Sequence, residues 1–174
     1  MAEQRIAKVK PVRRAASAAG PIVMVRQAGE SGAGPEAAGL ADLLAAQGFS
    51  VQVDPGVGLS FMFEGGQYFV PQQEQDSLFY HLLFPNFWEL ESDEEYGRAL
   101  LACDAVNREA KLVKLHTVEG DVWAGIEALH DGPEAFMAFL PRYLGFVQDS
   151  VRAFRDVMLA PLDGEEEPED DTAG

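Results

Sequence analysis

The sequence predicts an α+β fold: an antiparallel β-sheet of five or six strands with three helices, in the order α-β-β-β(-β)-α-β-β-α. Short alternating apolar segments joined by tight turns are typical of hairpins rather than of βαβ units. Three longer segments have the apolar spacing of helices. With 174 residues, of which 47% are hydrophobic, the chain can bury one core.

The first helix is followed by a meander of strands. Gly34-Pro35 opens the helix, because proline suits a first helical turn, and Gly48 closes it. Glu64-Gly65-Gly66 is a tight hairpin connection between two of the strands that follow. Strands are predicted at residues 49–54, 59–63, 67–70 and 77–84.

A second helix is predicted from Ser92 to about Arg108. Ser92 and Glu95 have the spacing of a capping box. In that motif the serine hydroxyl accepts from the N–H of Glu95, and the Glu95 carboxylate accepts from the N–H of Ser92. One stripe of this helix contains Tyr96, Leu100, Cys103 and Asn107.

A hairpin and a long helix complete the predicted fold. Segments 112–118 and 121–128 pair around Glu119-Gly120, and Gly132-Pro133 starts the helix. Pro141 can kink this helix or split it in two. An apolar stripe at helical spacing contains Phe136, Leu140, Tyr143, Val147, Val151, Phe154 and Met158. The stripe must pack on the sheet or on a partner chain, since each such side chain gains about 1.5–3 kcal/mol on burial.

Charge divides the chain into three parts. Residues 1–26 contain six basic side chains and one acid, whereas the rest contains seven basic and 28 acidic side chains. We expect a flexible basic arm at residues 1–33, the α+β domain at residues 34–162 and a disordered acidic tail at residues 163–174. The arm is either a solvated tail or a tether to an acidic partner.

Composition argues against several classes of protein. The net charge of −16 repels phosphate backbones, so no nucleic-acid partner is expected. The single cysteine, Cys103, cannot form an internal disulfide or a Cys-based zinc site, and we expect it in the core. No apolar run approaches the roughly 20 residues of a bilayer span, and no continuous signal region is present. We therefore expect a cytoplasmic protein without membrane contact.

Linear motifs for catalysis or for a cofactor are lacking, so the sequence predicts no enzyme, no cofactor and no metal site. The segment from Gly32 to Ala37 imitates a dinucleotide fingerprint, but Pro35 removes a backbone donor and only hairpins follow. The alternative is a small-molecule-binding domain or an enzyme. It would use dispersed carboxylates and His81 or His116 in a cleft between sheet and helices.

Aromatic residues crowd around Pro85-Asn86. Such a cluster fits either the core and sheet edge or a protein-binding or dimer surface. The candidate surface residues, with a tryptophan from the second hairpin, are Phe79, Tyr80, Phe84, Phe87, Trp88 and Trp123.

Several segments follow one another in an order typical of one bacterial family. They are FSVQVD at 49–54, LSFMFEGGQY at 59–68, FWEL at 87–90, AVNREAKLVK at 105–114 and DVWAGIE at 121–127. Together with the long last helix, they make residues 38–158 resemble the YbjN-like family of bacterial sensory transduction regulators.

The resemblance implies a fold like that of the type III secretion chaperones, with helices packed on one antiparallel sheet. It also implies a cytoplasmic bacterial protein that lacks catalytic machinery and acts by binding another protein. Secretion chaperones are usually dimeric, so we expect a homodimer. Asn107 and Lys114 match positions of the family pattern whose role the sequence leaves open. The sequence thus predicts a non-catalytic regulatory or chaperone-like protein-binding module.

Overall fold

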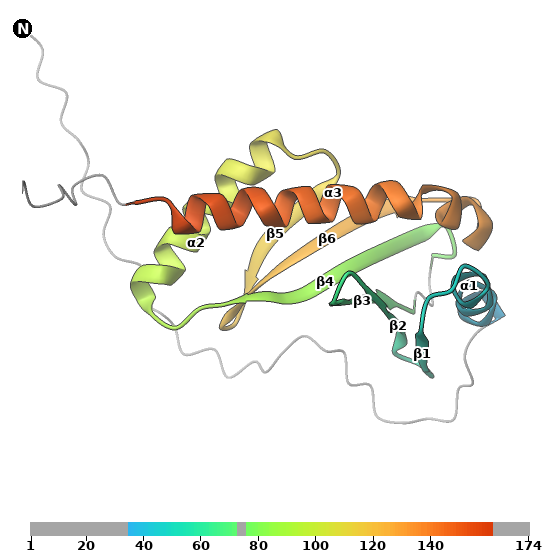
Figure 1. Cartoon of the computed structure of the whole chain (residues 1–174). Helices are drawn as coiled ribbons and strands as arrows, with labels where there is room; N and C mark the ends of the chain where they lie inside the picture. Colours follow the sequence, from blue (N-terminus) through green and yellow to red (C-terminus); the bar gives the residue numbers. More distant parts are fainter. Residues whose placement is uncertain (1–34, 73–75, 162–174) are drawn as a thin grey trace, which may run out of the picture.

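The computed structural model describes residues 35–72 and 76–161, so the predicted arm and tail lie outside the described residues. Within these ranges the chain forms three helices and six strands, and the predicted α+β class and element order are confirmed (Figure 1). The elements are α1 (Pro35–Ala46), β1 (Val51–Asp54), β2 (Gly58–Phe63), β3 (Gly66–Pro71), β4 (Phe79–Glu89), α2 (Asp93–Glu109), β5 (Val113–Val118), β6 (Asp121–Leu129) and α3 (Pro133–Leu159).

The strands form one open sheet in the order β1-β2-β3-β4-β6-β5, with every neighbouring pair antiparallel. β1 to β4 are the predicted meander. β6 then pairs with β4, so that β5, its hairpin partner, lies at the edge of the sheet. The β2–β3 turn needs left-handed backbone at Glu64 (φ 47°) and at Gly65 (φ 79°), as a two-residue hairpin turn of this kind requires.

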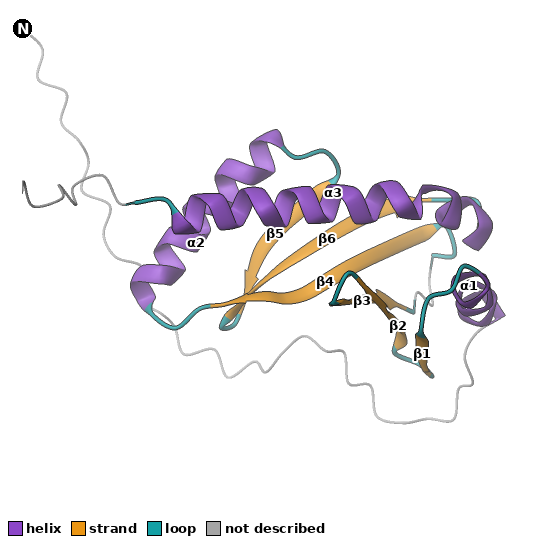
Figure 2. Ribbon diagram, in the orientation of Figure 1, coloured by secondary structure: helices purple, strands orange, loops and turns teal. Residues whose placement is uncertain are grey.

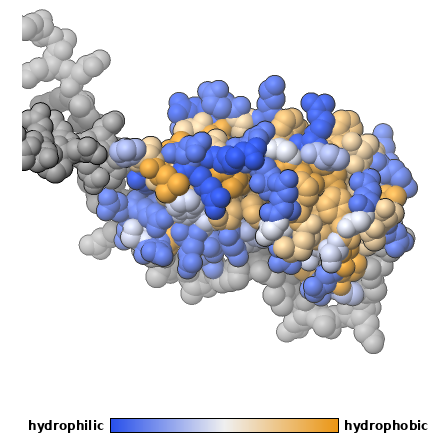
Figure 3. All heavy atoms as spheres, in the orientation of Figure 1, coloured by the Kyte–Doolittle hydropathy of each residue, from blue (hydrophilic) through white to orange (hydrophobic). Residues whose placement is uncertain are grey.

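The three helices lie on one face of the sheet (Figure 2). α3 crosses β4, β5 and β6, α2 packs beside β5, and α1 contacts β1, β2 and α3. All seven residues of the predicted apolar stripe of α3 are buried against this face. In the view of Figure 3 this side of the molecule is mixed, with hydrophilic side chains along the middle and the left and hydrophobic ones gathered toward the right.

α3 runs unbroken from Pro133 to Leu159 although Pro141 lies inside it, so Pro141 does not split the helix. The physical reason is the long buried stripe. Packing of that stripe on the sheet outweighs the one backbone hydrogen bond that proline removes.

The start of α2 follows the predicted capping box in one half only. The Ser92 hydroxyl accepts from the Glu95 N–H at 3.1 Å, as expected. The Glu95 carboxylate, however, accepts from the N–H of Glu91 at 2.9 Å and from the Trp88 indole at 2.8 Å, not from Ser92. These two donors lower the pKa of Glu95 and tie the start of α2 to the end of β4.

The packing of α2 differs from its predicted stripe. The buried positions are Ala99, Ala102, Cys103 and Val106, while Tyr96 and Leu100 are exposed. Small side chains let this helix approach the core closely, while the exposed Tyr96 accepts a hydrogen bond at its hydroxyl from Thr117 of the edge strand β5. Cys103 is buried as expected, and burial raises the pKa of its thiol to about 11.

β4 is longer than predicted and carries a bulge. Phe84 pairs with Ala124 and Trp88 pairs with Val122, so more residues of β4 than of β6 lie between these pairs. Asn86, inside the bulge, has left-handed backbone at φ 51°. The bulge bends β4 and redirects the side chains that follow Phe84.

Candidate functional site

The sheet face opposite the helices is the main candidate site. Among residues 35–72 and 76–161, helices pack only on the other face. We call the uncovered surface the open face. Because directly paired residues of antiparallel strands share a face, the register identifies its members. They include Gln52, Asp54, Ser60, Met62, Gln67, Phe69, His81, Leu83, Pro85, Lys114, His116, Trp123 and Glu127.

One row of side chains crosses all six strands of the open face. Gln52 pairs with Ser60, Ser60 with Phe69, and Phe69 with Leu83. Leu83 then pairs with Gly125, which pairs with Lys114. The row is polar at both ends and apolar in the middle.

Gly125 lets the middle of the row pack closely. A Cβ atom there would lie 3.0 Å from Nε2 of His81 and 3.1 Å from a methyl carbon of Leu83. The two β4 side chains therefore lie over the β6 backbone, and only 8% of Leu83 is exposed although none of the three described helices covers it.

The β5 end of the open face carries a cluster of ionisable groups. The Lys114 ammonium donates to the Glu127 carboxylate in an ion pair, which lowers the pKa of Glu127. His81 pairs across the sheet with Glu127, and His116 pairs with Trp123. Burial lowers the pKa of both histidines despite the opposing effect of Glu127, so both imidazoles are neutral at pH 7.

This arrangement differs from a cleft between sheet and helices. His81 and His116 lie together on the open face with one carboxylate, Glu127. No group of three His, Cys, Asp or Glu side chains in the described part of the chain is placed to hold a metal ion. The cluster is a set of polar contacts that a partner can use.

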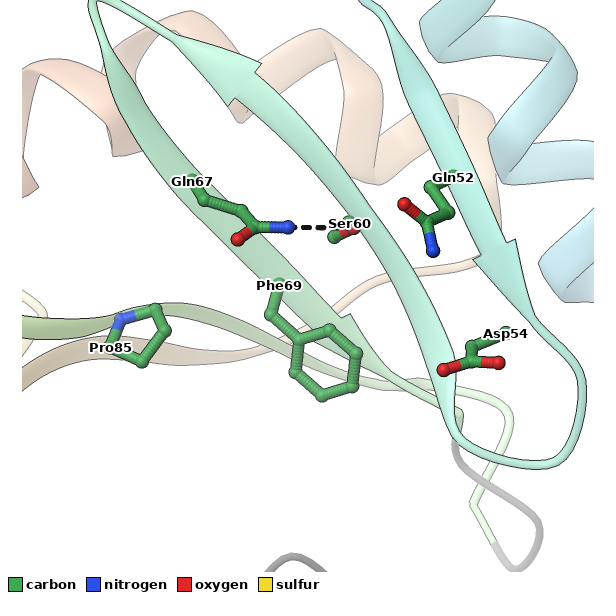
Figure 4. Close-up of a pocket in the computed structure, with 6 residues that line it drawn as sticks. All are labelled: Gln52, Asp54, Ser60, Gln67, Phe69 and Pro85. Carbon is green, nitrogen blue, oxygen red and sulfur yellow. Dashed lines mark hydrogen bonds between the residues drawn. The ribbon is translucent and has the colours of Figure 1, made fainter.

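A small pocket occupies the β1–β4 end of the open face (Figure 4). It is a half-open hollow with a volume of about 270 Å³, and its lining side chains are Gln52, Asp54, Ser60, Gln67, Phe69 and Pro85. The Gln67 side-chain amide donates to the Ser60 hydroxyl at 3.3 Å. Within the described ranges, the Asp54 carboxylate has neither a hydrogen-bond donor nor a cation beside it.

The candidate aromatic residues are divided between the two faces. Four lie on the helical side or in the bulge and pack in the core. Tyr80 stacks on Phe136 at 4.8 Å between ring centroids, and Phe84 stacks on Tyr68 at 4.8 Å. Phe87 and Trp88 meet the ring of Phe154 edge-on, at 5.3 Å and 5.7 Å.

Phe79 and Trp123 are the two candidate aromatics that lie on the open face. Phe79 pairs across the sheet with Leu129, which is 70% exposed. Trp123 is half-buried opposite the β4 bulge, and its indole N–H is enclosed without an acceptor in the part of the chain that the structure describes.

The two residues of the family pattern have clear structural contacts. Asn107 on α2 binds the backbone of β5: its Nδ2 donates to the Leu115 carbonyl at 2.9 Å, and its Oδ1 accepts from the Leu115 N–H at 2.8 Å. Lys114 forms the ion pair on the open face described above. Asn107 therefore supplies hydrogen-bond partners to the backbone of an edge strand, whereas Lys114 lies on the candidate binding surface.

Sequence reasoning missed the pocket residues of β1 to β3. The available signal was the strand alternation itself, which places Gln52 and Asp54 on the same side of one strand. That pattern could not reveal that Ser60, Phe69 and Pro85 would stand beside them, because strand register is a tertiary property.

Comparisons with known proteins found no relative. No protein-family model matches the chain, and neither the curated proteins nor the solved structures contain a match. The YbjN-like resemblance therefore stays a prediction. Among the described helices, none has both the length and the apolarity that crossing a bilayer requires.

Proposed function

We propose that this chain is a non-catalytic regulatory or chaperone-like module that binds another protein through the open face of its sheet. The observation that carries the proposal is a sheet covered by described helices on one face only. The uncovered face has an apolar middle between polar ends. Protein interfaces commonly combine an apolar, aromatic centre with a polar rim.

The composition of the open face supports this role. Its middle contains Phe69, Leu83 and Trp123, and aromatic side chains of this kind often dominate binding energy. Asp54 at one end and Lys114 at the other supply charges that can fix the orientation of a partner. The YbjN-like resemblance adds the regulatory or chaperone-like character, the cytoplasmic setting and the homodimer.

The test of the protein-binding role compares two surfaces of the same protein. Tagged wild-type chain is used to capture partners from the source cell, beside Trp123→Ala and Met62→Glu on the open face. Phe139→Ala is the matched control, since Phe139 is a 47% exposed aromatic side chain on α3. Met62 is 48% exposed, so we expect Met62→Glu to leave the core intact. This variant therefore tests the open face even if Trp123→Ala weakens folding.

We expect a specific partner that is retained by Phe139→Ala and lost from both open-face variants. Capture that survives both open-face substitutions, in variants that unfold at the same urea concentration as the wild type, would contradict the proposal. The homodimer is tested separately by size-exclusion chromatography with light scattering, where we expect about twice the chain mass of 18.9 kDa.

A small-molecule-binding domain or an enzyme is the second candidate, and the cluster of His81, His116 and Glu127 favours it. Thermal-shift screening against metabolites and nucleotides tests it. A rise of several degrees with one compound class, abolished by His81→Gln, would favour this candidate over protein binding.

A further inference from the structure

We propose that the pocket between β1 and β4 binds a basic side chain, and that residues 1–26 of this same chain supply it. The inference concerns an occupant of one end of the open face. It is independent of whether the middle of that face binds another protein.

The polar lining of the pocket combines one carboxylate, Asp54, with three neutral side chains that can both donate and accept, Gln52, Ser60 and Gln67. Asp54 contributes a carboxylate without a partner among the described residues, and Gln67 keeps its side-chain carbonyl free while its amide N–H donates to Ser60. No lysine, arginine or histidine is among the lining residues. Acceptors without a neighbouring cation favour a positively charged group over an anion.

The remaining lining suits the aliphatic stem and the planar head of an arginine. Phe69 and Pro85 form an apolar side of the pocket next to the acceptors (Figure 4). A guanidinium can stack on an aromatic ring while its N–H groups reach a carboxylate. The volume of about 270 Å³ lies just below the range of small-molecule pockets and leaves room for an arginine side chain.

Charge and connectivity identify the chain's own N-terminal residues as the occupant. Six of the thirteen basic residues lie in residues 1–26, while the rest of the chain is strongly acidic. These residues connect to α1, which contacts β1 and β2 on the face opposite the pocket; because β1 is an edge strand, they can reach the pocket around that edge. Arg26 is nine residues before Pro35, a separation that an extended chain can stretch to about 30 Å.

Tethering gives this segment an advantage over free ligands. A basic segment joined to the domain by a short linker is present at an effective concentration on the order of millimolar. A basic peptide from another protein must therefore displace it. When residues 1–26 occupy the pocket, access of another ligand to this end of the open face depends on the salt concentration and on competing cations.

A spin label placed in the arm tests the inference in the full chain. A nitroxide is attached at Gly20→Cys, and the amide signals of Ser60 and Phe69 are followed by NMR. Cys103 is buried and does not compete for the label. We expect strong broadening of both signals, lost in Asp54→Asn and at about 0.5 M salt. Glu64→Gln is the control, because Glu64 is an exposed acid of the β2–β3 turn outside the pocket.

Three results would overturn the inference: no broadening at low salt, broadening that persists in Asp54→Asn, or loss of broadening in Glu64→Gln as well. A sample that mixes labelled and isotope-enriched copies detects contacts between molecules. Equal broadening in that sample would assign the arm to a second copy and would overturn binding within one chain. Neither result changes the capture experiment, which varies Trp123 and Met62 outside the pocket lining.

Discussion

Asn107 acts at the scale of a single residue to close the exposed edge of the sheet. β5 is an edge strand, and unpaired edge groups invite another strand to pair. The Asn107 carboxamide makes both hydrogen bonds that a neighbouring strand would make to Leu115. This contact accounts for an asparagine near the end of α2 without requiring a role in binding.

We predict that Asn107→Ala lowers the free energy of unfolding by about 1–3 kcal/mol, because two backbone groups of β5 lose their partner. Urea titration measures the change. Arg108→Ala is the control: its ion pair with Asp104 joins side chains that are 70% and 72% exposed, so we expect a change of about 0–0.5 kcal/mol. Equal midpoints for the two variants would contradict the assigned role of Asn107.

Gly66 gives a second prediction at this scale. A Cβ atom there would lie 2.7 Å and 2.9 Å from ring carbons of Phe84, which is itself stacked on Tyr68. We expect Gly66→Ala to lower the free energy of unfolding by about 1–3 kcal/mol through overpacking. Gly97→Ala on α2, where the new methyl group meets nothing within 4 Å, should instead raise it by about 0.5–1 kcal/mol. Thermal unfolding of both variants measures whether the two changes in stability have opposite signs.

At the scale of the element, α3 shows packing prevailing over local preference. It is a helix of 27 residues with a proline inside, and its buried stripe spans its length from Phe136 to Met158. Pro141 is exposed, so its side chain contributes little to the core. The cost of Pro141 is thus mainly a missing backbone hydrogen bond.

We predict that Pro141→Ala raises the free energy of unfolding by about 1–3 kcal/mol, because alanine restores a backbone donor within the helix. Urea unfolding followed by far-UV circular dichroism measures it. Gly145→Ala, one turn further along, is the control and should add at most about 1 kcal/mol. A loss of stability in Pro141→Ala would mean that the proline shapes α3 to fit the sheet.

At the scale of the whole molecule, burial places all three histidines in environments that disfavour their charged form. The pKa of His81, His116 and His130 is lowered chiefly by desolvation. His130 lies among Tyr80, Phe136, Phe139 and Tyr143, and one of its ring nitrogens is 2.8 Å from the Tyr143 hydroxyl.

We predict that the molecule loses stability as the pH falls from about 7 to 5. In this window the unfolded chain, with histidine pKa values near 6.5, binds more protons than the folded chain, so the free energy of unfolding decreases as the pH falls. The urea concentration at the midpoint of unfolding should stay constant between pH 7 and 8.5 and should decrease below pH 7. The decline should be smaller in the His81→Gln, His116→Gln double variant. An unchanged midpoint between pH 7 and 5 would contradict the burial effect.

Local patterns were sufficient where neighbouring residues decide the structure. The apolar stripe of α3 predicted its buried face, and Glu64-Gly65 predicted a hairpin turn, because both depend on residues close in sequence. The aromatic cluster shows the limit. Phe79 and Tyr80 are adjacent in sequence, yet they point to opposite faces of β4, and composition alone cannot tell which face the helices cover.

The sequence by itself therefore determined the class of the fold, the order of its elements and the buried face of α3. The tertiary structure alone decided that β6 joins β4, that one sheet face stays uncovered by the described helices, and that Asp54, Gln67 and Pro85 line one pocket. The physical reason is the separation along the sequence over which each interaction acts. Turns and helical spacing act over a few residues, whereas strand pairing joins segments that only the folded chain brings together.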